Sequence, residues 1–167
     1  MCAVKTKYVQ IAAAIWTLVL AAAAQDALPA VAGVKLPLLA GVALFAALTY
    51  PRGAALLLAT AAGLLADALT GLPPSCATAF LALAALALSC TRANARDLPR
   101  PVAGAVALGA TAVGGEIWYT LAGVSAGGTL VLRLCSALPL GLATGAGLFA
   151  VLDGVLRHIG LADGEAA

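Results

Sequence analysis

Three ionisable residues stand inside long apolar stretches of the chain: Asp67, Glu116 and Arg133. A charge within a membrane helix almost always faces the other helices and finds a partner there. Asp67 comes four residues before Gly71 and Arg133 four residues after Thr129, so at 1.5 Å per residue both lie roughly 6 Å from the same end of their helices. We expect Arg133 to lie between the carboxylates of Asp67 and Glu116 in one intramembrane charge cluster.

This charge cluster has two interpretations. It ties three helices together, or its carboxylates belong to a proton or ion path. Because one base and two acids neutralise each other without a relay chain, we favour the structural role. An aspartyl protease needs two carboxylates that share a proton, and an adjacent arginine would lower both of their pKa values. We therefore expect the chain not to be an enzyme.

Metal and cofactor sites are not indicated either. The only histidine is His158, and the four cysteines form no CxxC pair, so we expect no metal site and no cofactor. The sequence is compatible with a disulfide between Cys76 and Cys135, but buried free thiols are the favoured interpretation.

The elements that must position the charges are apolar stretches of membrane-spanning length. Hydrophobic residues make up 63% of the 167 residues and charged residues only 10%, and the mean hydropathy is +1.08, which is typical of an integral membrane protein. Each stretch is close to the ~17–25 residues that cross a bilayer. The sequence predicts one all-α domain over 1–167, a compact six-helix bundle with spans at 8–24, 31–50, 53–71, 75–90, 101–122 and 129–151.

The basic residues predict the orientation of the bundle. Lys35 falls alone on one side, and the positive-inside rule then places both termini in the cytoplasm. The fourth connection carries a basic loop that attracts anionic lipid or, less favoured, docks a cytoplasmic partner. The first span resembles a signal peptide ending in AAAAQDA, but it is long for one and is expected to be retained. The cytoplasmic cations are Lys5, Lys7, Arg52, Arg157 and the loop residues Arg92, Arg96 and Arg100.

Small residues recur every four positions in two spans. These two rows, which we call the small-residue ladders, predict close helix packing. Each ladder also carries a charge, so both are expected to face inward, and Asp153 is expected to pair with Arg157 at i,i+4. Trp16 is expected to pack inside the bundle, while the Ala-rich faces of the first and fourth spans are left for partners. The ladders are Ala55, Ala59, Gly63, Asp67, Gly71 and Arg133, Ala137, Gly141, Gly145, Phe149, Asp153; the candidate docking residues are Ala12, Ala13, Ala14, Ala82 and Ala85.

One segment resembles a known family. GLLADALTG (63–71) is similar to the G-L-x-x-D-x-x-x-G segment of the MreD family, small multi-span proteins of the bacterial cell-elongation machinery. Lys35 and Pro37 at the second span and the turn YPRG (50–53) agree with the family over residues 35–92, and size and topology agree over the whole chain. The chain departs from the family after Gly71, where Pro74-Ser75 replaces a Leu-Gly pair.

The resemblance implies a non-enzymatic scaffold in the bacterial cytoplasmic (inner) membrane. The resemblance implies that the chain binds MreC, a single-span protein. Through MreC it would be connected to the MreB filament and to the RodA glycosyltransferase and a class B penicillin-binding protein, which act in peptidoglycan synthesis. No nucleic-acid partner is expected. MreD also resembles in fold the substrate-binding subunits of energy-coupling-factor transporters. The alternative function is therefore a vitamin-type transporter subunit, although the short, apolar outer connections favour the scaffold.

Overall fold

The computed structural model describes residues 2–28, 36–70, 73, 75–91, 98–123 and 130–158, with the main chain only for residues 2–11. Within this part of the chain the structure is all-helical and has no strand. The helices are α1 (Cys2–Ala27), α2 (Leu38–Thr49), α3 (Arg52–Thr70), α4 (Cys76–Cys90), α6 (Arg100–Leu121) and α7 (Leu130–His158).

Prolines and glycines set the helix boundaries. Pro51 separates α2 from α3 because the residue before a proline is biased away from helical backbone, and Tyr50 is extended with φ −98° and ψ 162°. Pro101 lies in the first turn of α6, where its missing N–H group has no helical acceptor to lose. Gly123 follows the end of α6 with φ +70°, the left-handed conformation typical of a helix C-terminus. Pro139 lies inside α7, which continues through it.

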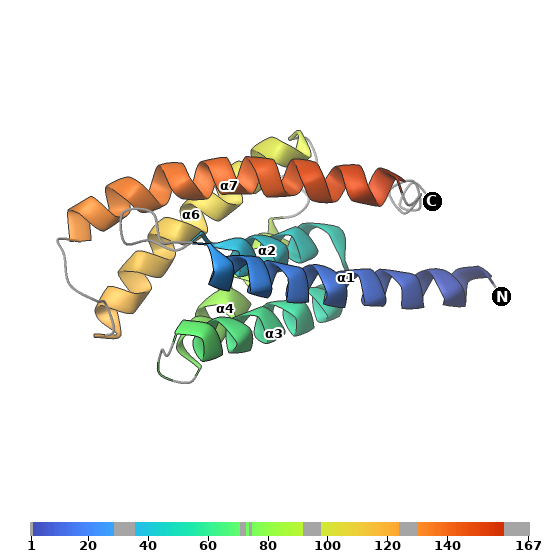
Figure 1. The fold of residues 1–167 in the computed structure, drawn as a ribbon, viewed down its shortest axis with the longest axis horizontal. Helices are drawn as coiled ribbons and strands as arrows, with labels where there is room; N and C mark the ends of the chain where they lie inside the picture. Colours follow the sequence, from blue (N-terminus) through green and yellow to red (C-terminus); the bar gives the residue numbers. More distant parts are fainter. Residues whose placement is uncertain are drawn as a thin grey trace.

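Successive helices run antiparallel, so the bundle has two distinct ends (Figure 1). We call the end where α1, α3 and α6 finish and α2, α4 and α7 start the cap end. The other is the termini end, because α1 begins there and α7 finishes there. The charged side chains described below gather at these two ends.

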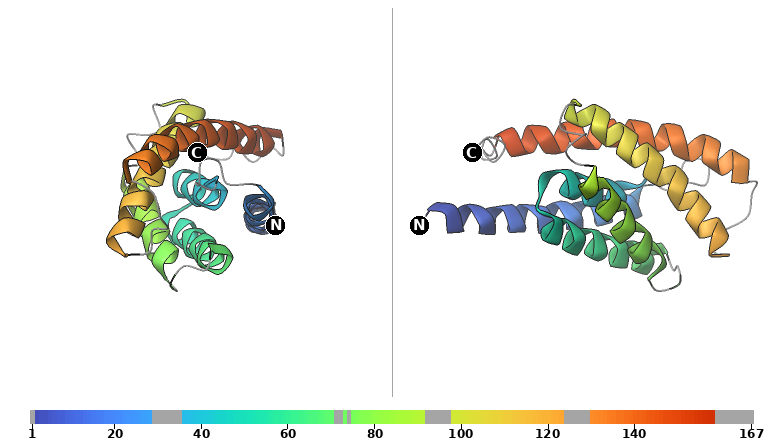
Figure 2. Two further views of the ribbon diagram at one scale, coloured as in Figure 1. Left: turned by 60° about the vertical axis from the view of Figure 1, so that its left-hand side comes forward. Right: turned by 180° about the vertical axis from the view of Figure 1, so that it is seen from behind.

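The shortest of the described helices, α2, lies at the centre of the bundle. It contacts α1, α3, α4, α6 and α7, and Figure 2 shows it enclosed by its neighbours. A helix that is apolar on every side belongs in such an interior. Eight of its residues are buried: Leu39, Gly41, Val42, Ala43, Leu44, Phe45, Ala46 and Ala47.

Two aromatic rings fill the space between α2 and the α6–α7 pair. The Phe45 and Phe149 rings meet edge to face with centroids 5.1 Å apart. Gly104 on α6 makes room for Phe149, since a Cβ at Gly104 would lie 2.2 Å from the ring. Leu44 and Leu108 complete this buried cluster.

Three described helices are long and apolar enough to cross a membrane: α3, α6 and α7. Large apolar side chains lie on the outside of the bundle, among them Leu57 at 73% exposed and Leu121 at 82%. This is the surface expected of a protein that faces lipid. α4 at 15 residues agrees with the predicted span 75–90 to within one residue. α2 at 12 residues is shorter than the predicted span 31–50, and α7 at 29 residues extends beyond 129–151.

Three expectations about side-chain location are wrong. Ala85 is 1% exposed and Ala14 is 9% exposed, so both belong to the interior and not to a docking face. Trp16 is 66% exposed and faces outward. The thiols of Cys90 and Cys135 are exposed instead of buried, and both Cys76 and Cys135 are free.

Candidate functional site

Asp67 caps the N-terminus of α4. One carboxylate oxygen accepts a hydrogen bond from the Ala77 N–H group at 2.8 Å. The other accepts from the Thr78 N–H group at 3.2 Å and from the Thr78 hydroxyl at 2.7 Å. The first N–H groups of a helix have no partner within the helix, and negative charge is favoured there. Asp67, 7% exposed, therefore receives charge-assisted hydrogen bonds without a cation.

The local sequence explains why α4 needs this cap. Its N-cap residue, Ser75, has φ 75° and ψ 1°, and its side chain makes no capping hydrogen bond. Asp67 reaches the helix because Gly63, one turn earlier on α3, allows α4 to come close. A Cβ at Gly63 would lie 2.3 Å from Thr78 Cα. The glycine and the aspartate of the GLLADALTG segment thus act together in joining α3 to α4.

A second helix is capped in the same way by a residue that the sequence analysis missed. The Gln25 side-chain carbonyl on α1 accepts a hydrogen bond from the Leu39 N–H group in the first turn of α2, at 3.0 Å. Gln25 is 9% exposed, and the N-cap of α2, Pro37, has no side-chain hydrogen bond of its own. An amide side chain at the end of the first apolar stretch, just before the proline-containing connection QDALP (25–29), is the sequence signal that could have identified it.

The remaining pair at the cap end is an ion pair between α6 and α7. Arg133 Nη2 lies 3.2 Å from Glu116 Oε2, and the two side chains are 19% and 12% exposed. The two groups are in contact but are not aligned as a hydrogen bond, so Glu116 Oε2 is buried without a hydrogen-bond partner. The pair is neutral as a whole, which reduces the cost of placing either charge in the bundle.

The predicted cluster of three charges is thus divided. Arg133 pairs with Glu116 as expected, but the hydrogen bonds of Asp67 go to α4. The two parts remain neighbours, because Trp118, two residues from Glu116, bonds to the Cys76 carbonyl next to Ala77, which Asp67 caps.

An aromatic group links α4 to α6 beside these charges. Trp118 Nε1 donates a hydrogen bond to the Cys76 carbonyl oxygen at 3.2 Å. The Phe80 ring lies 6.1 Å from the Trp118 ring and 6.3 Å from the Tyr119 ring, centroid to centroid. The cap end is consequently joined across four helices by Asp67, Trp118 and the Glu116–Arg133 pair.

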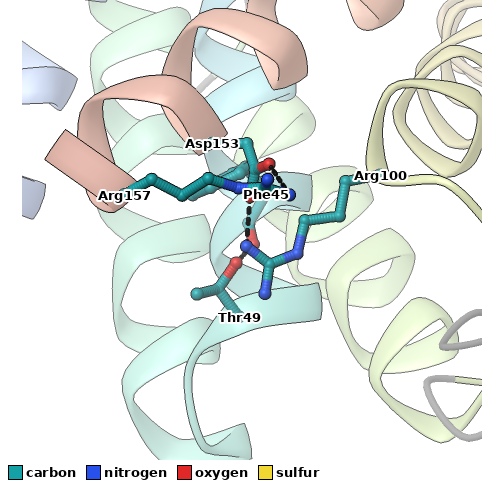
Figure 3. Close-up of polar contacts among 5 residues, drawn as sticks. All are labelled: Phe45, Thr49, Arg100, Asp153 and Arg157. Carbon is teal, nitrogen blue, oxygen red and sulfur yellow. Dashed lines mark hydrogen bonds and ion pairs between the residues drawn. The ribbon is translucent and has the colours of Figure 1, made fainter. Parts of the chain in front are cut away.

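A second charge group lies at the termini end (Figure 3). Asp153, 7% exposed, forms ion pairs with Arg157 at 2.8 Å and with Arg100 at the start of α6. The Asp153–Arg157 pair was predicted. Arg100 was expected in a basic loop, and its contact with Asp153 was not foreseen. Arg92 and Arg96 lie outside the described residues.

The helix-packing glycines lie where two backbones come close. A Cβ at Gly145 would lie 2.4 Å from the Gly104 carbonyl oxygen, and one at Gly141 would lie 3.0 Å from Gly109 Cα. Both ladders face inward, because Ala55, Ala59, Gly63 and Asp67 are buried, as are Ala137, Gly141, Gly145, Phe149 and Asp153. Gly71 lies outside the described residues.

No group of three or more histidine, cysteine or acidic residues that could hold a metal occurs among the described residues. The contacts observed at the cap end are hydrogen bonds and a charge pair between helices. No family model matches the chain, and neither a curated protein nor a solved structure matches it.

Proposed function

We propose that this chain is an MreD-like membrane scaffold that carries out no catalysis and binds MreC, a single-span protein of the cell-elongation machinery. One observation carries the proposal: Gly63 and Asp67, two positions of the segment similar to MreD, work as one unit, the glycine admitting α4 and the aspartate capping it. MreB, RodA and a class B penicillin-binding protein would be reached through MreC.

The proposal includes six spans in the bacterial inner membrane with both termini in the cytoplasm. It is supported by the antiparallel course of the helices and by the positions of the α1 start and the α7 end at one end of the bundle (Figure 1). Arg52, Arg100 and Arg157 lie at that same end, as the positive-inside rule requires. At 1.5 Å per residue α2 and α4 are roughly 18 and 22 Å long, so flanking residues would complete their spans.

The packed centre favours a scaffold over a vitamin-binding subunit. The largest fully buried side chains are Phe149, Leu39, Leu44 and Leu108. Three of them pack with Phe45 in the cluster between α2 and the α6–α7 pair. A bundle filled in this way gains its stability from close packing at its centre.

The exposed face of α1 is the proposed contact for the partner helix. Ile15, Trp16, Val19 and Leu20 are between 49% and 66% exposed, and their 3–4 residue spacing places them on one side of the helix. Helix association in lipid depends on close packing, and a large aromatic side chain is a frequent hot spot of an interface. This face replaces the Ala-rich faces, of which Ala14 and Ala85 are buried.

Co-purification from native membranes tests the proposal. The tagged chain is expected to recover a single-span protein with a large periplasmic region, and Trp16→Ala to reduce that recovery about tenfold or more. Leu57→Ala is the matched control, because Leu57 is 73% exposed on α3, away from the proposed face. Recovery of a vitamin-sized ligand in stoichiometric amount, with no such partner, would support the transporter-subunit alternative instead.

A further inference from the structure

The two ends of the α6–α7 pair carry arginine–carboxylate sites of different composition. At the cap end one arginine meets one glutamate, and both side chains are largely buried. At the termini end two arginines share one aspartate, and the side chains of Arg100 and Arg157 are 41% and 70% exposed. The first site is neutral and closed, whereas the second is cationic and open.

Asp153 satisfies only part of each guanidinium group. An arginine has five N–H donors in a planar fork. Arg100 uses Nη1 and Arg157 uses Nη2 toward opposite oxygens of Asp153. The shared carboxylate holds both guanidinium groups in one place and neutralises one of their two charges. Because the Arg100 and Arg157 side chains are 41% and 70% exposed, the cluster presents a net positive charge and guanidinium N–H groups to its surroundings.

Both helices that carry the arginines also expose apolar side chains. Val102 on α6 and Val155 on α7 lie two residues from Arg100 and Arg157, which places them on other sides of their helices than the arginines. They are 46% and 47% exposed, and Val151, one turn before Val155, is 62% exposed. The two arginines thus lie at the end of two apolar helices that can cross a membrane, where the headgroups of lipids are expected.

We propose that Arg100 and Arg157, positioned by Asp153, form a binding site for the phosphate of an anionic phospholipid such as phosphatidylglycerol. Phosphate fits the planar arginine fork through two parallel hydrogen bonds, which a zwitterionic lipid with its own ammonium group satisfies less well. The acyl chains then meet the apolar outer surface of the bundle. This site is independent of the scaffold role, because it uses a different part of the surface from α1.

Lipid binding to the purified full-length protein tests this site. The probes are phosphatidylglycerol and phosphatidylcholine, measured by native mass spectrometry or by titration in detergent. The wild type is expected to prefer phosphatidylglycerol, and Arg157→Gln to weaken that binding about fivefold, as expected for one cation near an anionic surface. Arg157→Lys keeps the charge without the fork and is expected to fall between the two.

Arg52→Gln is the matched control, because it removes an exposed arginine from the start of α3 at the same end. It is expected to leave binding of phosphatidylglycerol within about twofold of the wild type, since a general surface charge adds little specificity. Equal losses in the Arg52 and Arg157 variants would overturn the proposal. Displacement of the lipid by an equal concentration of glycerol phosphate would also overturn it, because the site would then be one for soluble anions. Thermal melting confirms that each variant is folded.

Discussion

Asp67 shows how a helix terminus stabilises a carboxylate within an apolar helix, and among the described residues it forms no ion pair. It accepts three hydrogen bonds, two of them from backbone N–H groups at the start of α4. These donors would otherwise lack partners, so the aspartate and the helix terminus satisfy each other. Arg133 is then free to neutralise Glu116. Hydrogen bonding and ion pairing are thus assigned to different residues at the same end of the bundle.

Replacing Asp67 with alanine is expected to lower the free energy of unfolding by about 2 kcal/mol, because it removes a helix cap and leaves N–H donors of α4 unsatisfied. Thr70→Ala is the control. Thr70 lies one turn further along α3, and its hydroxyl donates to the Ala66 carbonyl oxygen of its own helix. Unfolding in detergent, followed by circular dichroism, measures both variants. Equal melting temperatures would contradict the capping role.

At the scale of the elements, glycines decide how closely the helices approach. Gly63 brings α4 to α3, and Gly145 brings the α7 backbone onto Gly104 of α6. Helices in lipid associate through close packing with little hydrophobic driving force, so such contacts replace the apolar burial that holds a soluble bundle together. The aromatic pair Phe45 and Phe149 then fills the space next to α2.

Gly145→Ala is expected to lower the melting temperature, because its Cβ would lie 2.4 Å from the Gly104 carbonyl oxygen and 2.9 Å from Ala105 Cα, and neither backbone atom can move without shifting α6. Overpacking of this kind costs about 1–3 kcal/mol. Gly147→Ala adds the same atom two residues later on α7, where nothing lies within 4 Å. This control is expected to be neutral or stabilising, since alanine favours the helix by up to about 1 kcal/mol. The contact role of Gly145 would be wrong if both variants melted alike.

For the whole molecule, a central short helix gives the bundle its arrangement. α2 has 12 residues and is in contact with five other helices, whereas α6 and α7 are long and lie largely against each other. The three helices of membrane-spanning length, α3, α6 and α7, surround it together with α1 and α4. The number of crossings therefore depends on whether α1, α2 and α4 span together with their flanking residues.

Single-cysteine labelling on a background without Cys2, Cys76, Cys90 and Cys135 distinguishes the topologies. Six spans place a cysteine at position 75 outside and one at position 94 inside, because α4 then crosses the membrane. A cysteine at position 125 is expected to react from outside, and one at position 166 only after permeabilisation. If only α3, α6 and α7 cross, positions 75 and 94 react from the same side. Labelling with an impermeant maleimide measures each site.

Much of this structure follows from local sequence pattern. The helical character, the boundaries near Pro51, Pro101 and Gly123, and the inward direction of both small-residue ladders could be predicted, because each depends on residues within a few turns of one helix. The pair Asp153–Arg157 belongs to the same class, since its partners stand four residues apart on α7. The Glu116–Arg133 pair followed from depth in the apolar stretch and the need of a charge for a partner.

The tertiary structure alone decided which of several possible partners each buried group meets. Asp67 binds the start of α4 instead of Arg133, Gln25 caps α2, and Arg100 meets Asp153 across 53 positions of the sequence. Residue spacing predicts how deep a side chain lies along its own helix and which side of the helix it occupies. It does not predict the angle at which two helices cross, nor which other helix ends close enough to bond with that side chain. Those are set by close packing over the whole bundle, in which Gly63, Gly145 and the central α2 determine how near each pair of helices lies.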